Sequence, residues 1–260
     1  MDVLHEEGGL VGLVPAAEGW PSLGKQALVV LVGVTGVGKS SALAALPGLK
    51  VLPDRREITD AVMILPVLGR PVRDREERFA LSADYRRTHP GGMAQALGSL
   101  HADPTRWSGP LVFDGLRGAD EVRYAAEQFP AWRFVSLHAP DALRVRRLLG
   151  RADSFDQVAG RATTSDLRGA LERLEGSGEV FGAHDLDELA ALTGQGYSAA
   201  DILTKARIVV SERRNYDPQA ARSVLAPLPA WRHLELDTVQ VSAQQVAERV
   251  AAWLPLEEGP

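Results

Sequence analysis

Residues 33–40 form the stretch whose residue types and spacing point most directly to chemistry. They read Gly33-Val34-Thr35-Gly36-Val37-Gly38-Lys39-Ser40 and fit the pattern G-x-x-x-x-G-K-[ST]. Glycines let the backbone turn where a Cβ would forbid it, so successive N–H groups can face one concavity that suits an anion. A helix beginning at Gly38 or Lys39 would point the positive end of its dipole at the same anion.

Two polar side chains complete this pattern. Lys39 supplies a point charge for the β- and γ-phosphates of a nucleoside triphosphate, and the Ser40 hydroxyl supplies a ligand for Mg²⁺. The alternative is a glycine-rich turn that binds nothing. The pattern favours a triphosphate site made by Gly33, Val34, Thr35, Gly36, Val37, Gly38, Lys39, Ser40 and Ser41.

The segments on either side of the loop have the character that such a site needs. Ala27–Val32 is an apolar run, typical of a strand buried on both faces. Ser41–Leu46 is rich in helix formers and stops at Pro47 and Gly48. Strand, loop and helix are therefore expected in the order that binds phosphate.

Asp114 is the second candidate for chemistry. It ends the apolar stretch Leu111-Val112-Phe113, which predicts a strand whose carboxyl end carries an acid. Ligands of open α/β sheets bind at that edge, where the carboxylate could orient Mg²⁺ or accept a proton from an attacking hydroxyl. The alternative is a solvated aspartate in an ordinary Asp-Gly turn.

Several arginines are placed to meet phosphate. Arg117 follows Asp114 at the same edge, where an acceptor phosphate is a reasonable partner. Arg147 and Arg151 lie one helical turn apart and could clamp the γ-phosphate during transfer. Arg144 and Arg146 fit a solvated helix face better.

A further charged group follows the expected second strand, on the side where an acceptor would bind. Asp54, Arg55 and Arg56 are the candidate substrate residues here, together with Arg117. Arg86, Arg87 and His89 are weaker candidates for the same pocket, because a charge cluster is usually plain surface.

The elements that must position these residues alternate between strand and helix. Strands are expected at Lys50–Pro53, Pro110–Phe113, Arg133–Leu137, Arg207–Val210 and Arg232–Leu236, and helices at Glu121–Phe129, Asp141–Arg151 and from Ser242 to Trp253. This alternation predicts a three-layer α/β fold of the P-loop NTPase type, with a mainly parallel sheet and helices on both faces.

The chain divides into three expected parts. Residues 1–25 lack a period and predict an irregular extension, and residues 26–151 and 205–256 form the core. Residues 152–204 are polar, with leucines at helical spacing, and predict an inserted helical lid.

Composition excludes several classes of protein. The 260 residues carry a net charge of −5, which argues against dedicated nucleic-acid binding, and contain no cysteine. The apolar runs are too short to span a bilayer, and the first residues lack the basic start of a secretory signal, so a cytoplasmic location is expected.

The loop and two later stretches together resemble the P-loop nucleotide kinases, above all dephospho-coenzyme A kinase-like and adenylate kinase-like proteins. These stretches are Phe113–Val122, which carries D-G-x-R and E-V, and Phe134–Arg151, which carries A-P and R-x-x-R-L-x-x-R. The resemblance implies ATP·Mg²⁺ as phosphoryl donor, a five-stranded parallel sheet and a mobile lid. It also implies that Arg147 and Arg151 lie at the lid base near the phosphates.

The leading hypothesis is an enzyme, an ATP-dependent kinase acting on a small phosphorylated or hydroxyl-bearing acceptor such as a nucleotide. Lys39, Asp114, Arg147 and Arg151 would be catalytic, and Ser40 and Asp114 would hold Mg²⁺. One alternative is an NTPase switch or AAA-like regulatory ATPase, although the GTPase run N/T-K-x-D is missing. Another is a kinase of nucleic-acid ends, which the net charge disfavours.

Overall fold

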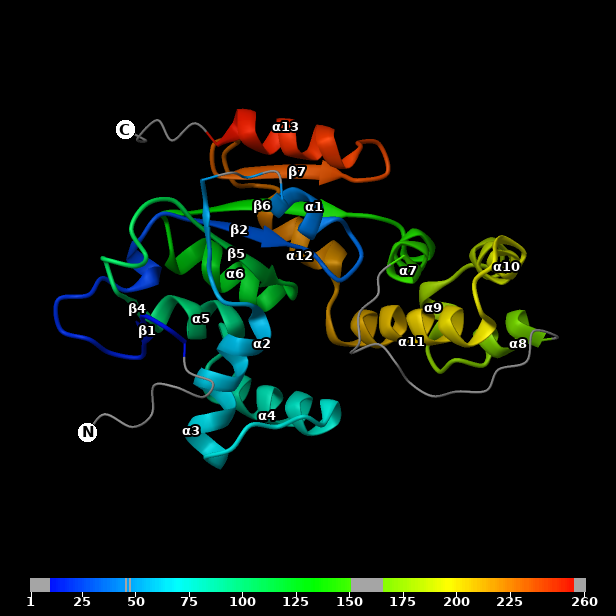
Figure 1. Cartoon of the computed structure of the whole chain (residues 1–260), viewed down its shortest axis with the longest axis horizontal. Helices are drawn as coiled ribbons and strands as arrows, with labels where there is room; N and C mark the ends of the chain where they lie inside the picture. Colours follow the sequence, from blue (N-terminus) through cyan, green and yellow to red (C-terminus); the bar gives the residue numbers. More distant parts are fainter. Residues whose placement is uncertain (1–9, 45, 47, 151–165, 255–260) are drawn as a thin grey trace.

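The computed structural model describes residues 10–44, 46, 48–150 and 166–254 (Figure 1). Its centre is a parallel sheet of five strands in the order β3-β5-β2-β6-β7. The strands are β2 (Leu28–Val32), β3 (Lys50–Val51), β5 (Leu111–Leu116), β6 (Trp132–His138) and β7 (His233–Asp237). The expected α/β class with a parallel sheet is therefore confirmed.

Strand β2 lies in the middle of the sheet and is buried throughout. Its alternate side chains enter two different cores, as the period of a strand requires. Leu28, Val30 and Val32 pack into one core, whereas Val29 and Leu31 pack into the other. A strand covered on both faces needs apolar residues at every position, and this explains the continuous apolar run.

Helices cover both faces of this sheet, as expected (Figure 1). On one face lie α1 and α13, whose Ala42, Val246 and Val250 share a core with Val29 and Leu31. The helices on the other face include α5, α6 and α12. Their bounds are α1 (Lys39–Ala44), α5 (Gly92–Ser99), α6 (Ala119–Gln128), α12 (Pro218–Leu225) and α13 (Ala243–Trp253).

Helix α13 begins where the sequence predicts. Ser242 accepts a hydrogen bond from Gln245 N, and the Gln245 side chain accepts one from Ser242 N. This reciprocal cap satisfies two N–H groups that a helix start leaves open.

The segments before β5 also pack against the core. The connection between β3 and β5 is mostly helical, and residues 10–25 hold a short strand that pairs with β4, so the described part of the expected irregular extension is not wholly irregular. The bounds are β1 (Leu13–Val14), η1 (Leu23–Lys25), α2 (Arg55–Ile58), the π-helix η2 (Thr59–Ile64), α3 (Leu65–Leu68), α4 (Arg75–Thr88) and β4 (His101–Ala102).

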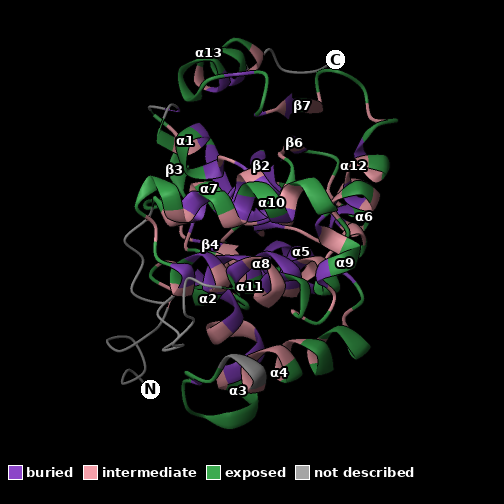
Figure 2. Cartoon of the chain, turned by 90° about the vertical axis from the view of Figure 1, so that its right-hand side faces the viewer, coloured by how far each residue is buried: buried purple, intermediate pink, exposed green. Residues whose placement is uncertain are grey.

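A group of helices between β6 and β7 forms a core of its own beside the sheet, here called the helical cluster (Figures 1 and 2). Its leucines at helical spacing, such as Leu171, Leu186 and Leu189, are buried against one another. The helices are α7 (Asp141–Leu149), α8 (Leu167–Glu172), α9 (Ser177–Val180), α10 (Ala183–Ala191), η5 (Leu192–Gln195) and α11 (Ala199–Asn215).

The strand predicted at Arg207–Val210 is wrong, because these residues lie inside the long helix α11. Val209 and Val210 are buried in the helical cluster, so packing overrides the β-propensity of branched residues. The expected boundary between residues 204 and 205 also falls within this helix. None of the helices in the described ranges combines the length and the apolar character needed to cross a bilayer.

Candidate functional site

The glycine-rich loop joins the carboxyl end of β2 to α1, as its flanks predict. Gly33 and Gly36 have φ of 150° and 87°, a region that favours glycine. A Cβ on Gly33 would lie 2.7 Å from the Leu137 carbonyl oxygen, and one on Gly36 would lie 3.1 Å from Arg144 Cβ. Backbone shape and close neighbours therefore both require glycine here.

Donors for an anion remain in this loop. Among the described residues, no hydrogen-bond acceptor is found for the backbone N–H groups of Gly36, Val37 and Gly38. Other members of the predicted loop already have partners, since Thr35 N donates to Glu212 and Ser41 N donates to the Gly38 carbonyl. The central part of the loop is thus the part whose N–H groups have no acceptor among the described residues.

The Lys39 side chain is held across the loop. Its Nζ donates to the Val34 carbonyl at 3.0 Å and lies 3.7 Å from Asp114 Oδ1. Lys39 is only 8% exposed. Burial lowers the pKa of the ammonium from its ordinary value, while the Asp114 charge opposes that shift. A phosphate beside Lys39 would add further negative charge next to this buried cation and so favour its charged form.

Asp114 stands on β5 in register with Leu31 of β2, so the fold brings it to the mouth of the loop. Its Oδ1 is buried and has no hydrogen-bond partner among the described residues. Ser40, which directly follows Lys39 in the sequence, is exposed. A hydroxyl and a carboxylate are the hard oxygen ligands that Mg²⁺ takes when phosphates and water complete its shell. The residues therefore fit the predicted metal.

Glu212 of α11 is a site residue that the sequence did not reveal. It is only 4% exposed and accepts hydrogen bonds from Thr35 N at 3.0 Å and Thr35 Oγ1 at 2.5 Å. It also accepts from Arg117 Nη1 at 2.7 Å and Arg144 Nη2 at 2.5 Å. Burial by itself would raise the pKa of Glu212, but Arg117 and Arg144 outweigh it and hold the pKa below its ordinary value. These contacts favour the ionised form of Glu212.

Arg117 approaches this group from the end of β5, as expected from its place after Asp114. Its Nη1 is bonded to Glu212, and its Nε is buried with no hydrogen-bond partner in the described chain. The guanidinium also lies over the Tyr216 ring, 6.0 Å from the centroid. Arg117 thus retains a donor beside the loop.

Arg144 differs from its expected place on a solvated face, because it is fully buried against the loop. Its Nε donates to the Thr35 carbonyl at 2.8 Å, and its Nη groups bond Asp141 and Glu212. A guanidinium has enough donors to satisfy three partners at once. Helix α7 is therefore tied to the loop through Arg144.

Arg147 bridges the loop to the turn after β7. Its guanidinium donates to Thr238 Oγ1 at 2.8 Å, to the Thr238 carbonyl at 2.7 Å and to the Gly36 carbonyl at 3.3 Å. Arg146, in contrast, is exposed. Arg151, the other predicted arginine of the lid base, lies outside the described residues.

The charged group after β3 has structural partners. The Asp54 side chain caps α2 by accepting from Arg56 N at 2.7 Å and Glu57 N at 2.8 Å. Arg55 makes a paired contact with Glu121, at 2.9 and 3.0 Å. Burial favours the neutral form of both groups, yet their mutual attraction lowers the pKa of Glu121 and raises that of Arg55. Arg56 is exposed.

The residues that were weaker candidates for binding the acceptor molecule lie at the end of α4. Arg86 and Arg87 are exposed, and Arg87 pairs with Asp84 at 2.9 Å. The His89 ring stacks on Tyr85 with centroids 4.0 Å apart. Arg87 and His89 therefore have partners within the protein, whereas Arg86 is exposed.

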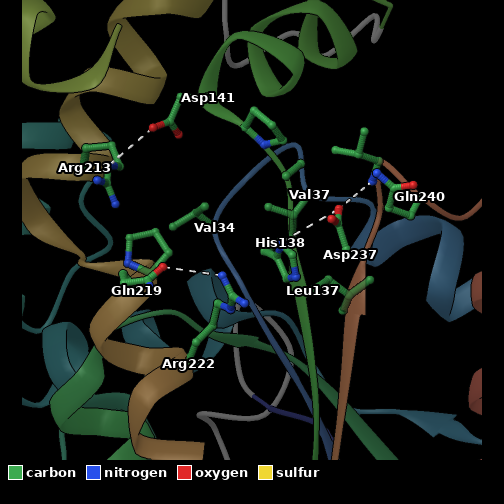
Figure 3. A pocket seen from close by; sticks show the side chains of 14 residues that line it. Val34, Val37, Leu137, His138, Asp141, Arg213, Gln219, Arg222, Asp237 and Gln240 are labelled. Atoms are coloured by element: carbon green, nitrogen blue, oxygen red, sulfur yellow. Dashed lines mark hydrogen bonds and ion pairs between the residues drawn. The ribbon is translucent and has the colours of Figure 1, made fainter. Parts of the chain in front are cut away.

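A cavity of about 450 Å³ lies at the carboxyl ends of β6 and β7 (Figure 3). Val34 and Val37 connect it to the glycine-rich loop. Arg213 Nε lies 3.4 Å from Asp141 but has no hydrogen-bond partner in the described chain, and Arg222 is bonded to Glu235 beside the cavity. Both arginines of the cavity therefore lie beside a carboxylate, although Arg213 keeps a donor, as Arg117 does.

Comparisons with known proteins identify no relative of this chain, so the candidate site is interpreted from its geometry. No protein-family model matches the chain, and no curated protein matches it. In the described ranges, no group of three or more His, Asp or Glu side chains is arranged to hold a metal by itself. A metal at Ser40 and Asp114 would therefore depend on ligand oxygens.

Proposed function

We propose that the chain is a P-loop kinase that binds ATP·Mg²⁺ at residues 33–41 and transfers the γ-phosphoryl group to a small acceptor. One observation carries the proposal: Lys39 is held between the Val34 carbonyl and Asp114, and Asp114 Oδ1 is buried without a hydrogen-bond partner in the described chain. A buried ammonium beside a carboxylate oxygen that accepts no hydrogen bond in the described chain, close to loop amides that have no acceptor there, is suited to phosphate and metal together.

The roles of the residues follow from these positions. The N–H groups of Gly36, Val37 and Gly38 would bind the β-phosphate, and Lys39 would bind the β- and γ-phosphates. Ser40 and Asp114 would hold Mg²⁺, which neutralises phosphate charge when bound. Arg117, which has a buried Nε without a partner among the described residues, would contact the γ-phosphate or an acceptor phosphate.

The acceptor is proposed to be a small phosphorylated or hydroxyl-bearing molecule, such as a nucleotide. Arg117 supports this side of the proposal because it stands at the same sheet edge as Asp114, and a guanidinium matches the geometry of phosphate oxygens. Asp114 could also accept the proton of an attacking hydroxyl. Positioning and charge stabilisation would supply most of the catalysis, as in other phosphoryl transfers.

Replacing Lys39 tests nucleotide binding directly. We expect wild-type protein to bind ATP·Mg²⁺ in calorimetry and Lys39→Ala to lose at least about tenfold in affinity, because a charge-assisted contact to phosphate is removed. The exposed Lys25 provides a matched control, since Lys25→Ala should leave the affinity unchanged. If Lys39→Ala bound ATP·Mg²⁺ as tightly as Lys25→Ala does, the proposal would be contradicted.

Transfer is tested with a panel of nucleotides, nucleosides and small cofactor precursors. We expect ATP consumption to rise with one class of acceptor and the product to carry one added phosphate, measured by coupled assay and mass spectrometry. Hydrolysis that no acceptor accelerates would instead support an NTPase switch.

A further inference from the structure

We propose that Glu212 is a positioning residue of the phosphate site, which holds Arg117 and Thr35 so that the site discriminates a triphosphate from a diphosphate. This inference rests on the proposed function and adds to it a residue and a determinant of specificity. It also gives the helical cluster a direct connection to the chemistry, because Glu212 belongs to α11.

The contacts of Glu212 join three elements that are distant in sequence. One oxygen, Oε1, accepts from Thr35 Oγ1 and Arg117 Nη1, and the other, Oε2, accepts from Thr35 N and Arg144 Nη2. Both carboxylate oxygens are therefore fully engaged. The loop, the end of β5 and helix α7 are fixed relative to one another by this single side chain.

Arg117 depends on Glu212 more than Arg144 does. Arg144 also bonds Asp141 and the Thr35 carbonyl, so it keeps partners if Glu212 is altered. For the Arg117 guanidinium, Glu212 is the one ion-pair partner in the described chain, and its other contact is the face of Tyr216, while the backbone N–H of Arg117 donates separately to Glu121. Loss of the carboxylate should therefore release the Arg117 guanidinium and leave α7 attached to the loop.

The terminal phosphate is the part of the ligand that Arg117 should affect. Arg117 directly follows β5, three residues after Asp114, and Gly33 N of the loop donates to the carbonyl of the adjoining Leu116 at 3.0 Å. In the proposed binding mode, Lys39 reaches the β- and γ-phosphates, whereas the loop amides hold the β-phosphate. Because Arg117 leaves the sheet at the edge that carries Asp114, whose Oδ1 lies 3.7 Å from Lys39 Nζ, its guanidinium would reach the γ-phosphate, which ATP has and ADP lacks.

The experiment compares the affinities for ATP·Mg²⁺ and ADP·Mg²⁺ in wild type and Glu212→Gln by calorimetry. The variant should lose roughly tenfold in ATP affinity, the size of one charge-assisted contact, and change little in ADP affinity. Arg117→Ala should show the same selective loss. Because both substitutions act through the same Glu212–Arg117 contact, the double variant should bind ATP·Mg²⁺ no more weakly than either single variant does.

Two controls separate positioning from a general loss of structure. Glu127→Gln removes an exposed carboxylate of α6 and should leave both affinities unchanged. Glu212→Asp keeps the buried negative charge but withdraws it from Arg117, so it should fold and show a smaller ATP-selective loss. It serves as the test if circular dichroism shows that Glu212→Gln is unfolded.

The outcomes are distinct. Equal weakening of ATP and ADP, no change in either, or tighter ATP binding would each overturn the role of Glu212 while the proposed function stands. A wild-type protein that binds neither nucleotide would overturn the proposed function and this inference with it.

Discussion

At the scale of the residue, the candidate site depends on few charges held in place by burial. Lys39, Asp114 and Glu212 interact electrostatically, and all lie at the carboxyl edge of the sheet or against the loop that leaves it. Asp114 has one oxygen without a hydrogen-bond partner in the described chain. A buried oxygen that accepts no hydrogen bond is costly even beside the Lys39 ammonium, so a metal ion or a water molecule bound to the metal is a reasonable ligand for it.

Asp114→Asn is expected to remove the part of nucleotide affinity that depends on Mg²⁺. The amide keeps the size of the side chain but loses the charge that favours a hard cation. Affinity measured with excess Mg²⁺ should fall toward the value measured with EDTA, and the EDTA value itself should change little. The exposed Asp120 is the matched control, because Asp120→Asn should retain the full Mg²⁺ dependence.

At the scale of the element, several charged residues that sequence alone assigns to chemistry also hold helices in place. Asp54 caps α2, and Arg55 pairs with Glu121 at the start of α6. Arg147 attaches α7 to the glycine-rich loop, as does Arg144, which the sequence assigns to a solvated helix face. A side chain whose donors or acceptors are used in this way has fewer left for a ligand.

Asp54→Ala should therefore act on stability. Losing an N-cap costs about 1 kcal/mol in the free energy of unfolding, because two helix N–H groups lose their acceptor. Urea unfolding should show that decrease, while the affinity for ATP·Mg²⁺ stays at the wild-type value. Glu18→Ala, at an exposed position, should change neither. A loss of acceptor turnover at unchanged stability would indicate that Asp54 contacts substrate.

At the scale of the whole molecule, two buried carboxylates couple folding to pH. Burial acts to raise the pKa of Glu121 and Glu212, but arginine partners dominate and hold both pKa values below the ordinary one. Between the folded and unfolded pKa values, the unfolded chain binds more protons than the folded chain. These groups thus contribute stability above the unfolded pKa of about 4.3, and that contribution is lost as pH falls through the folded values.

The free energy of unfolding should accordingly decrease as pH falls below about 4, as measured by urea titrations at a series of pH values. Glu121→Gln should be destabilised by about 3 kcal/mol at pH 7, because Arg55 is left buried without its partner. Its remaining pH dependence should be shallower than that of wild type. An equally steep acid loss in this variant would show that Glu121 does not contribute.

The amino-acid sequence by itself determined the features whose causes lie within a short stretch of chain. The glycine spacing, the apolar run of β2 and the Ser242 cap of α13 all appear where they are expected. Each depends on backbone conformation or on neighbours a few residues away, so the pattern contains the information. The alternation of strands and helices was enough to predict the parallel sheet.

Tertiary structure alone decided the contacts between distant parts. Thr35 and Glu212 are 177 positions apart, and Arg55 and Glu121 are 66 apart, so no local pattern marks them. Arg207–Val210 became helix because α11 buries its valines against other helices, where packing outweighs local preference. The position of Glu212 follows from that helix, and only the folded chain places its carboxylate beside the loop.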